Sequence, residues 1–435
     1  MAKQNYQLAL ITLFLSIIFK ARCYVYMCWY VNWSELRPIR PFSADQIDYD
    51  LCTHILYSAA VIDPKTLTIA FMQQNVSENL EKILNSKIKY KNLKIILTIG
   101  SYDTKSYGFE SVTNPNDTQA MLNFSNNLVA YLRKFNFDGV LLDYEFPGMV
   151  NRAPLFTKEG FSLLIRKLKR KFKEESIISE KTELILMSTM AARVDWINKF
   201  YEIDKIISYL DYMLLLTYDL KRSSEKRTRI TSALFPKANE TGIYSTFNIA
   251  SVVAKYLTEG AKANKMVIGI PAYGRSYELT DSLDNMPGAL AKGPGLPGLI
   301  TDETGVLSYF EICDKAQKND SKKFWDESNL GPYLVYDEKY WIGYEDMDSV
   351  YEKMLFIKAN NLSGAFLWSI DLDDFDGKHC SQGKYPLLKA IRSELTFNDY
   401  ETNDFLINSI THFTCSQGRV VQCLQKELYK PHDKD

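Results

Sequence analysis

The sequence predicts an α/β fold, and within that class a (β/α)8 barrel, because apolar strand-like runs alternate with segments of helical spacing. Eight runs are rich in β-branched, Leu and aromatic residues, and strands that alternate with helices form parallel sheets. A doubly wound open sheet is the alternative, but no Gly-x-Gly-x-x-Gly follows a strand-like run. The strand-like runs are 24–33, 53–61, 94–100, 137–145, 183–191, 211–219, 266–274 and 364–372. The helical candidates are 77–91, 117–134, 158–175, 196–207, 247–264, 347–361 and 385–395.

The N-terminal segment, residues 1–23, is typical of a secretory signal peptide. The apolar run 8–19 follows Lys3 and is too short to cross a bilayer comfortably. Cleavage after Ala21 or Cys23 would release a secreted protein without a membrane span. Basic residues directly after the run are unusual for a signal, so an uncleaved anchor is the alternative.

The cysteines and sequons fit a secreted chain. Of seven cysteines, six remain if Cys23 leaves with the signal, and an even number suits an oxidising compartment. Six cysteines allow many pairings, so the residues alone do not choose among them. The Asn-x-Ser/Thr sequons, which favour a glycosylated surface, are at Asn32, Asn75, Asn116, Asn123, Asn239, Asn319 and Asn361.

The stretch 137–148 places two carboxylates at the end of a buried strand. The run before them is apolar, and Pro147 and Gly148 stop the strand immediately after them. Alternate residues of a strand share a face, so Asp143 and Glu145 point the same way, with Cα atoms roughly 6.6 Å apart. Parallel α/β folds place their chemistry at this end of their strands. On spacing alone, acids at the mouth of a solvent-exposed strand are the alternative.

The spacing of strands and helices breaks between the seventh and eighth strands. Residues 277–345 are rich in Pro and Gly at first and then carry Tyr-rich strand-like pieces. Such a long connection predicts a small α+β insertion subdomain at the active-site rim. The barrel with this insertion would span 24–395, and the polar stretch 396–435 would be a loosely attached tail.

Composition and motifs exclude several classes of function. The net charge is −1 and the pI is about 6.5, so there is no electrostatic case for a nucleic-acid partner. A basic run around 166–173 has apolar residues at helical spacing, which indicates a solvated helix face. The scattered histidines form no metal-ligand spacing, and no phosphate-cradling loop is present, so we expect neither a metal nor a cofactor.

The carboxylate stretch resembles the signature strand of glycoside hydrolase family 18, the chitinases and chitinase-like lectins, whose pattern is Asp-Gly-x-Asp-x-Asp-x-Glu. The positions that match are Asp138, Gly139, Asp143 and Glu145. The middle Asp of the pattern is Leu141 here, and the usual Trp before the Glu is Tyr144.

The resemblance covers the chain from about Cys28 to Arg392, in the family's order of strand ends. It implies a (β/α)8 barrel with an α+β insertion between strands seven and eight, acting on chitin or chito-oligosaccharides as a monomer. The segments that carry it are 28–38, 53–57, 94–102, 216–219, 269–276 and 364–375. It also implies disulfides Cys28–Cys52 and Cys313–Cys380, which leaves Cys415 and Cys423 as a third pair.

The resemblance further implies the site residues. Family members cleave β-1,4-linked N-acetylglucosamine with retention, using the substrate's acetamido oxygen as nucleophile. Glu145 would be the general acid and base, Asp143 would stabilise the acetamido group, and Tyr218 would hydrogen-bond to it. Aromatic walls suit sugars because their C–H faces stack on rings. The expected substrate contacts are Asp138, Asp219, Trp33, Tyr102, Tyr273, Arg275, Trp341 and Trp368.

Departures from the pattern leave two functions open. With Leu141 in place of a carboxylate, Asp143 lacks a partner that would share a proton, and we expect slower chemistry. The presence of Glu145 and Asp143 favours a secreted, endo-acting chitinase of reduced activity. The loss of the middle Asp and of groove aromatics favours a chitinase-like lectin that binds chitin oligosaccharides.

Overall fold

The computed structural model describes residues 24–71, 77–101, 104, 107–145, 147, 157–220, 226–238 and 240–397. The expected signal peptide, almost all of the tail with Cys415 and Cys423, and the groove residue Tyr102 lie outside these residues and stay predictions.

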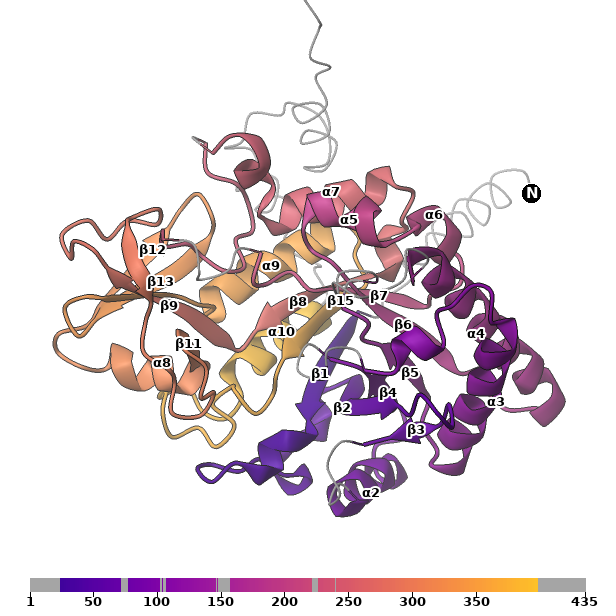
Figure 1. The fold of residues 1–435 in the computed structure, drawn as a ribbon. Helices are drawn as coiled ribbons and strands as arrows, with labels where there is room; N and C mark the ends of the chain where they lie inside the picture. The colour runs from indigo at the N-terminus through magenta and orange to yellow at the C-terminus, as the bar shows by residue number, and fades with distance from the viewer. Residues whose placement is uncertain are drawn as a thin grey trace, which may run out of the picture.

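Eight parallel strands close into a barrel, which confirms the predicted fold class (Figure 1). The first strand, β1 (Val25–Val31), pairs with both β2 (His54–Ile62) and β15 (Gly364–Trp368), and these two pairings close the sheet. The short strand β3 (Ile69–Ala70) adds to β2 in the antiparallel direction. The other barrel strands are β4 (Lys94–Ile99), β5 (Gly139–Leu142), β6 (Ile185–Met190), β7 (Tyr212–Leu215) and β8 (Met266–Pro271).

Helices surround the barrel, as Figure 1 shows for α3 and α4 beside β5 and β6. They are α2 (Ser77–Asn85), α3 (Thr118–Lys134), α4 (Thr157–Ser179), α5 (Val194–Phe200), α6 (Ile203–Ile206), α7 (Ile249–Thr258), α9 (Met347–Ala359) and α10 (Pro386–Thr396). Short 3-10 helices lie at Asn32–Leu36, Ala44–Gln46, Tyr49–Leu51, Ser86–Ile88, Phe109–Ser111, Gly242–Thr246 and Ala263–Lys265.

Local chemistry explains where some helices begin and end. The carboxylate of Asp117 accepts the N–H of Ala120 at 2.9 Å and caps α3, because the first N–H groups of a helix have no partner within it. The single helix expected at 196–207 is two helices instead. Tyr201, with φ −128° and ψ 153°, is extended and separates α5 from α6.

Two apolar layers hold the barrel, one inside it and one between strands and helices. Along β5, Leu141 belongs to the inner cluster, while Val140 and Leu142 belong to the outer one. Successive residues of a strand face opposite sides, so the inner face continues through Leu141 toward position 143. The inner cluster consists of Val25, Met27, Trp29, Val31, Leu56, Ile96, Leu141, Met187, Leu214, Val267 and Phe366.

A second, antiparallel sheet interrupts the barrel between β8 and β15, in the region where the sequence predicts an insertion. It begins at Tyr273, which pairs with Ser308, and so starts a few residues before the expected boundary. Figure 1 shows this sheet and its helix at one side of the barrel. Its elements are β9 (Tyr273–Leu279), β10 (Ala291–Pro294), β11 (Val306–Ser308), α8 (Tyr309–Ala316), β12 (Lys322–Asp326), β13 (Gly331–Tyr336) and β14 (Tyr340–Gly343).

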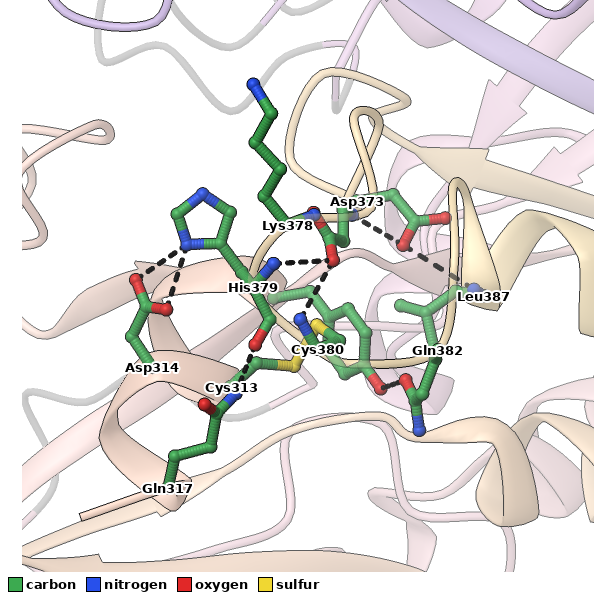
Figure 2. The surroundings of a disulfide bond; sticks show 11 residues. Cys313, Asp314, Gln317, Asp373, Lys378, His379, Cys380, Gln382 and Leu387 are labelled. Atoms are coloured by element: carbon green, nitrogen blue, oxygen red, sulfur yellow. Dashed lines mark hydrogen bonds and ion pairs between the residues drawn. A yellow bond between two sulfur atoms is a disulfide. The ribbon is translucent and has the colours of Figure 1, made fainter.

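Both disulfides that the family resemblance implies are present. Cys28 on β1 is bonded to Cys52 just before β2, and Cys313 on α8 to Cys380 in the loop after β15. Around the second disulfide, Nδ1 of His379 lies 2.8 Å from a carboxylate oxygen of Asp314 (Figure 2). The insertion is therefore fastened to the barrel by a covalent bond and by a polar contact beside it.

No helix among the described residues combines the length and the apolar character that crossing a bilayer requires.

An ion pair is buried where the insertion returns to the barrel. Nζ of Lys353 on α9 lies 2.7 Å from a carboxylate oxygen of Glu345, and both side chains are fully buried. The hydroxyl of Ser349 donates to the same carboxylate at 2.7 Å. Burial raises the pKa of Glu345, and Lys353 opposes that shift.

We expect Lys353→Met to lower the free energy of unfolding by roughly 3–5 kcal/mol, because it leaves Glu345 buried without its cation. The double variant Lys353→Met/Glu345→Leu should recover at least half of that loss. Urea denaturation of the two variants and of the wild type measures both values. A double variant no more stable than the single one would contradict this account.

Candidate active site

The two predicted acids lie immediately after β5, not within it. The strand pattern still continues for one residue, because the N–H of Asp143 donates to the carbonyl of Ile99 at 2.8 Å. Tyr144 belongs to the outer apolar cluster and stacks on Phe109, with ring centroids 4.5 Å apart. Asp143 and Glu145 flank Tyr144 and therefore face the inner side of the barrel rim.

Asp143 is held firmly in place. It is 1% exposed, and its Oδ1 accepts the hydroxyl hydrogen of Thr189 at 2.8 Å, from the neighbouring strand β6. Gly100, at the end of β4, allows the close approach: it has a φ of +90°, and a Cβ there would lie 2.4 Å from the carbonyl oxygen of Asp143. Glu145 is half-buried at the same rim.

Tyr218 lies close to both acids. Burial raises the pKa of its hydroxyl well above the usual value, and the nearby Tyr273, Glu145 and Asp143 raise it further. The hydroxyl is therefore protonated at neutral pH and can donate a hydrogen bond. Gly269 on β8 gives the ring its space, since a Cβ there would lie 2.6 Å from Tyr218.

Asp219 is clamped by neighbours on other segments. Nε of Arg275 donates to its Oδ1 at 2.8 Å, and a second guanidinium nitrogen donates to Oδ2 in a two-pronged ion pair. The hydroxyl of Thr231 donates to Oδ1 at 3.1 Å. Arg275 also pairs with Glu303 at 2.7 Å. Asp219 and Arg275 thus form one rigid polar unit between the barrel and the insertion.

Aromatic side chains stand at the same rim. Trp368, at the end of β15, and Trp33 are half-buried, and both pack against the inner apolar cluster. The ring of Trp29 meets Trp368 edge-on, with centroids 4.6 Å apart. Tyr273 is 5% exposed, and its ring centroid lies 6.1 Å from that of Tyr218. Of these rings, only Trp33 and Trp368 keep an accessible part at the rim, where a flat apolar face suits a sugar, whereas Trp29 and Tyr273 are buried.

Asp138 is not part of this group, and its prediction as a substrate contact is wrong. It precedes β5 and therefore lies at the end of the barrel opposite Asp143. There it forms ion pairs with Lys87 at 2.9 Å and Lys94 at 3.5 Å, and it accepts the N–H of Ile95. Its role in the structure is to join the N-terminal ends of β4 and β5.

The prediction that Trp341 lines the groove is also wrong for this structure. Its side chain is 0% exposed, in the apolar core of the insertion. It stacks on Tyr333 with centroids 5.3 Å apart, and its indole N–H donates to the carbonyl of Asn285 at 3.1 Å. No face of the ring is left for a ligand.

Sequence reasoning missed the residues that orient the acids. Thr189 had a readable signal, since it is a polar residue near the end of an otherwise apolar strand-like run. Thr231 and Phe109 had none, because Thr231 lies in an irregular segment and Phe109 begins a 3-10 helix too short to show a periodicity.

Among the described residues, Asp374, Asp376 and His379 bring carboxylate oxygens and an imidazole nitrogen, which are potential metal ligands, within 4.8 Å of one another. Arg40 already occupies this place, because its guanidinium donates to Asp376 at 3.0 Å and lies 2.6 Å from Nε2 of His379. The carboxylate of Asp374 accepts backbone N–H groups of the turn that ends at Cys380. The group stabilises this loop and does not have the character of a metal site.

A cavity of about 550 Å³ lies between the loop after β7 and the insertion, apart from the acids. Neither Asp143 nor Glu145 lines it, and two of its ionic groups, Arg229 and Glu240, pair with each other. Its other lining residues include Leu220, Ile230, Lys237, Tyr244, Phe247, Met286 and Asn329.

Comparisons with known proteins agree on one family. The model of "Glycosyl hydrolases family 18" matches residues 25–373. Mouse chitotriosidase-1 is 36% identical over 373 residues, which are 85% of this chain and 77% of that protein. Human chitinase-3-like protein 2 is 34% identical over 86% of this chain and 93% of its own length. A solved structure of human YKL-39, described as a pseudo-chitinase with retained chitooligosaccharide binding, superposes with a TM-score of 0.80 at 33% identity, covering 86% of this chain and all of that one.

We expect Gly100→Ala to destabilise the protein by roughly 2–3 kcal/mol, since the new methyl group strains the backbone and collides with the carbonyl of Asp143 and the ring of Phe109. The matched control is Gly242→Ala, which also has a positive φ but meets no atom within 4 Å, and it should cost about 1 kcal/mol. Thermal unfolding measures both. Equal losses would mean that the close contacts with Asp143 and Phe109 add nothing to the backbone strain.

Proposed function

The chain belongs to the family 18 glycosyl hydrolases, and on this basis we propose that it is a secreted chitinase. It would hydrolyse β-1,4-N-acetylglucosamine linkages with retention, as an endo-acting monomer, at a reduced rate. The observation that carries the proposal is the proximity of Glu145, Asp143 and Tyr218 at the C-terminal rim of the barrel. Secretion is supported by the apolar run 8–19 and by two disulfides.

In this mechanism Glu145 carries the proton. It donates the proton to the glycosidic oxygen as the bond to the leaving sugar breaks, while the acetamido oxygen of the retained sugar attacks its anomeric carbon. The resulting oxazolinium ion is opened by water, from which Glu145 takes a proton back. The half-buried position of Glu145 suits this double role, because the carboxyl is held at the rim of the barrel and can still be reached by a sugar and by water.

Asp143 and Tyr218 would act on the acetamido group. The carboxylate of Asp143 stabilises the positive charge that develops on the amide nitrogen, and Thr189 fixes the orientation of that carboxylate. The protonated hydroxyl of Tyr218 donates to the acetamido oxygen and aims it at the anomeric carbon. Trp368 would form the floor beneath the reacting sugar, with Trp33 and Tyr273 beside it.

Asp219 would bind the same sugar through the oxygen lone pairs that its partners leave free. Because Arg275 holds both of its oxygens, the carboxylate offers a fixed acceptor that need not reorganise when the ligand binds.

Leu141 is the reason to expect slow turnover. An aspartate there could share a proton with Asp143 and assist the acetamido group, whereas a leucine cannot. The absence of such a preorganised group costs on the order of 10²–10³ in rate in other enzymes.

The second candidate function is that of a chitinase-like lectin. Leu141 favours it, and so does the similarity to YKL-39, a pseudo-chitinase that retains chitooligosaccharide binding. The aromatic rim and the Asp219–Arg275 unit would serve binding alone as well as they serve catalysis.

Glu145→Gln should reduce hydrolysis of a fluorogenic chitobioside or chitotrioside at least 100-fold, since an amide cannot deliver the proton. Calorimetry with chitotetraose should show binding within a few-fold of the wild type. Wild-type turnover equal to that of Glu145→Gln would exclude the chitinase, and retained binding in both proteins would then support the lectin.

Leu141→Asp should raise the hydrolysis rate at least several-fold in the same assay, because it restores the carboxylate that can share a proton with Asp143. Leu141→Asn is the matched control, since it adds polarity without an acidic proton and should give a smaller gain. No gain in either variant would show that Leu141 does not limit the rate.

A further inference from the structure

The interior of the barrel contains three buried polar groups that the proposed mechanism does not use. They are the indole N–H of Trp29 on β1, the hydroxyl of Ser58 on β2 and the hydroxyl of Thr98 on β4, and all three side chains are 0% exposed. Within the part of the chain that the structure describes, no hydrogen-bond partner reaches any of the three.

The strand register places two of these groups side by side and next to Leu141. Thr98 pairs directly with Leu141 across β4 and β5. Tyr57 pairs with Leu97 and Ala60 with Ile99, and the register shifts between these pairs, so Ser58 and Ala59 together lie opposite Thr98. Ser58 pairs on its other side with Val31 of the inner apolar cluster.

All of these side chains face the inside of the barrel. Ser58 and Thr98 each lie two residues beyond a member of the inner apolar cluster, Leu56 and Ile96 respectively, and therefore share its face. Trp29 belongs to that cluster itself. Trp29 pairs with Leu56, two residues before Ser58, and its large ring fills the same interior. The three polar groups are thus all on the β1–β2–β4 side of the barrel interior, and Leu141 on β5 is next to Thr98.

Three unpaired polar groups in one barrel interior are costly. A buried donor without an acceptor costs about 1–3 kcal/mol, and native interiors seldom leave such groups unsatisfied. An indole N–H can only donate, whereas a hydroxyl can both donate and accept. A small neutral molecule that accepts and donates hydrogen bonds would satisfy them all, and water is the usual occupant of such interiors.

We propose that Trp29, Ser58 and Thr98 form an internal water-binding site beneath Asp143, and that this hydrated site positions the Asp143 carboxylate. Asp143 follows Leu141 on the inward face of β5, and Thr189 approaches it from the β6 side. Water on the β4 side supports the carboxylate from the opposite flank. The three residues are positioning residues, and their catalytic relevance rests on the proposed chitinase activity.

The first test substitutes a polar side chain for Leu141 itself. An amide at this position can displace the water and bond to Ser58 and Thr98. The fall in melting temperature caused by Leu141→Asn should therefore be less than half the fall caused by Ile96→Asn. Ile96 is the matched control, because it is equally buried in the same cluster and its register neighbours, Leu56 and Gly139, are apolar. Equal losses in the two variants would overturn the polar site.

The second test holds even if neither asparagine variant folds. Thr98→Val keeps the shape of the side chain and removes its hydroxyl. If the hydroxyl binds water, the melting temperature should fall by about 2 °C, and Thr98→Ser should recover part of that loss. An unchanged or higher melting temperature would mean that the hydroxyl has no partner and would overturn the proposal.

A third readout addresses the positioning of Asp143. Thr98→Val should move the acid limb of the pH–rate profile toward neutral pH, because a carboxylate with fewer hydrogen bonds ionises less readily. Ile96→Val, on the same strand, should leave that limb in place. An unmoved limb in Thr98→Val would refute the positioning role. The melting experiments stand even for a chain without hydrolase activity, so failure of the internal site and failure of the proposed function remain distinguishable.

Discussion

The constraint on which this structure depends is the closure of a parallel sheet through β1. Because β1 pairs with both β2 and β15, residues near position 29 and residues near position 368 become neighbours. Closure also forces all eight strands to end at one rim. The arrangement of the site is a consequence, since Asp143 follows β5, Tyr218 follows β7 and Trp368 ends β15, and the three meet only because the sheet is closed.

The same closure creates an interior that water does not reach freely, and it makes each inward side chain significant. A polar group there must find a partner inside the barrel, as Asp143 finds Thr189. An apolar side chain such as that of Leu141 offers no hydrogen bond to the inward side chains of the adjacent strands, such as Thr98. The residue at position 141 therefore belongs to a shared interior layer, and its effect extends beyond its direct neighbour Thr98.

The sequence predicted the barrel well, because the alternation of apolar runs and helical spacing is a long-range pattern that tolerates local errors. It also predicted that Glu145, Asp143, Tyr218 and Trp368 lie at or just after the ends of strands, where the structure has them, while their roles stay predictions. The prediction that Asp138 contacts the substrate was wrong because a motif specifies which residues are neighbours in sequence, and not which end of a strand each one occupies. The prediction that Trp341 lines the groove was wrong because the two-residue alternation of a strand does not reveal which face of the second sheet is covered. Contacts such as Thr231 with Asp219 depend on loop paths that no periodicity encodes.

The disulfide between Cys313 and Cys380 has a consequence for the integrity of the chain. It encloses β12, β13, β14, α9 and β15, and with them the rim residue Trp368. A protease that cuts the exposed hairpin turn at Glu338 would divide the chain into two polypeptides, but the disulfide would keep them covalently joined. A nicked molecule would thus migrate as one species until a reductant is added, and the strand that completes the barrel would stay anchored to its partners.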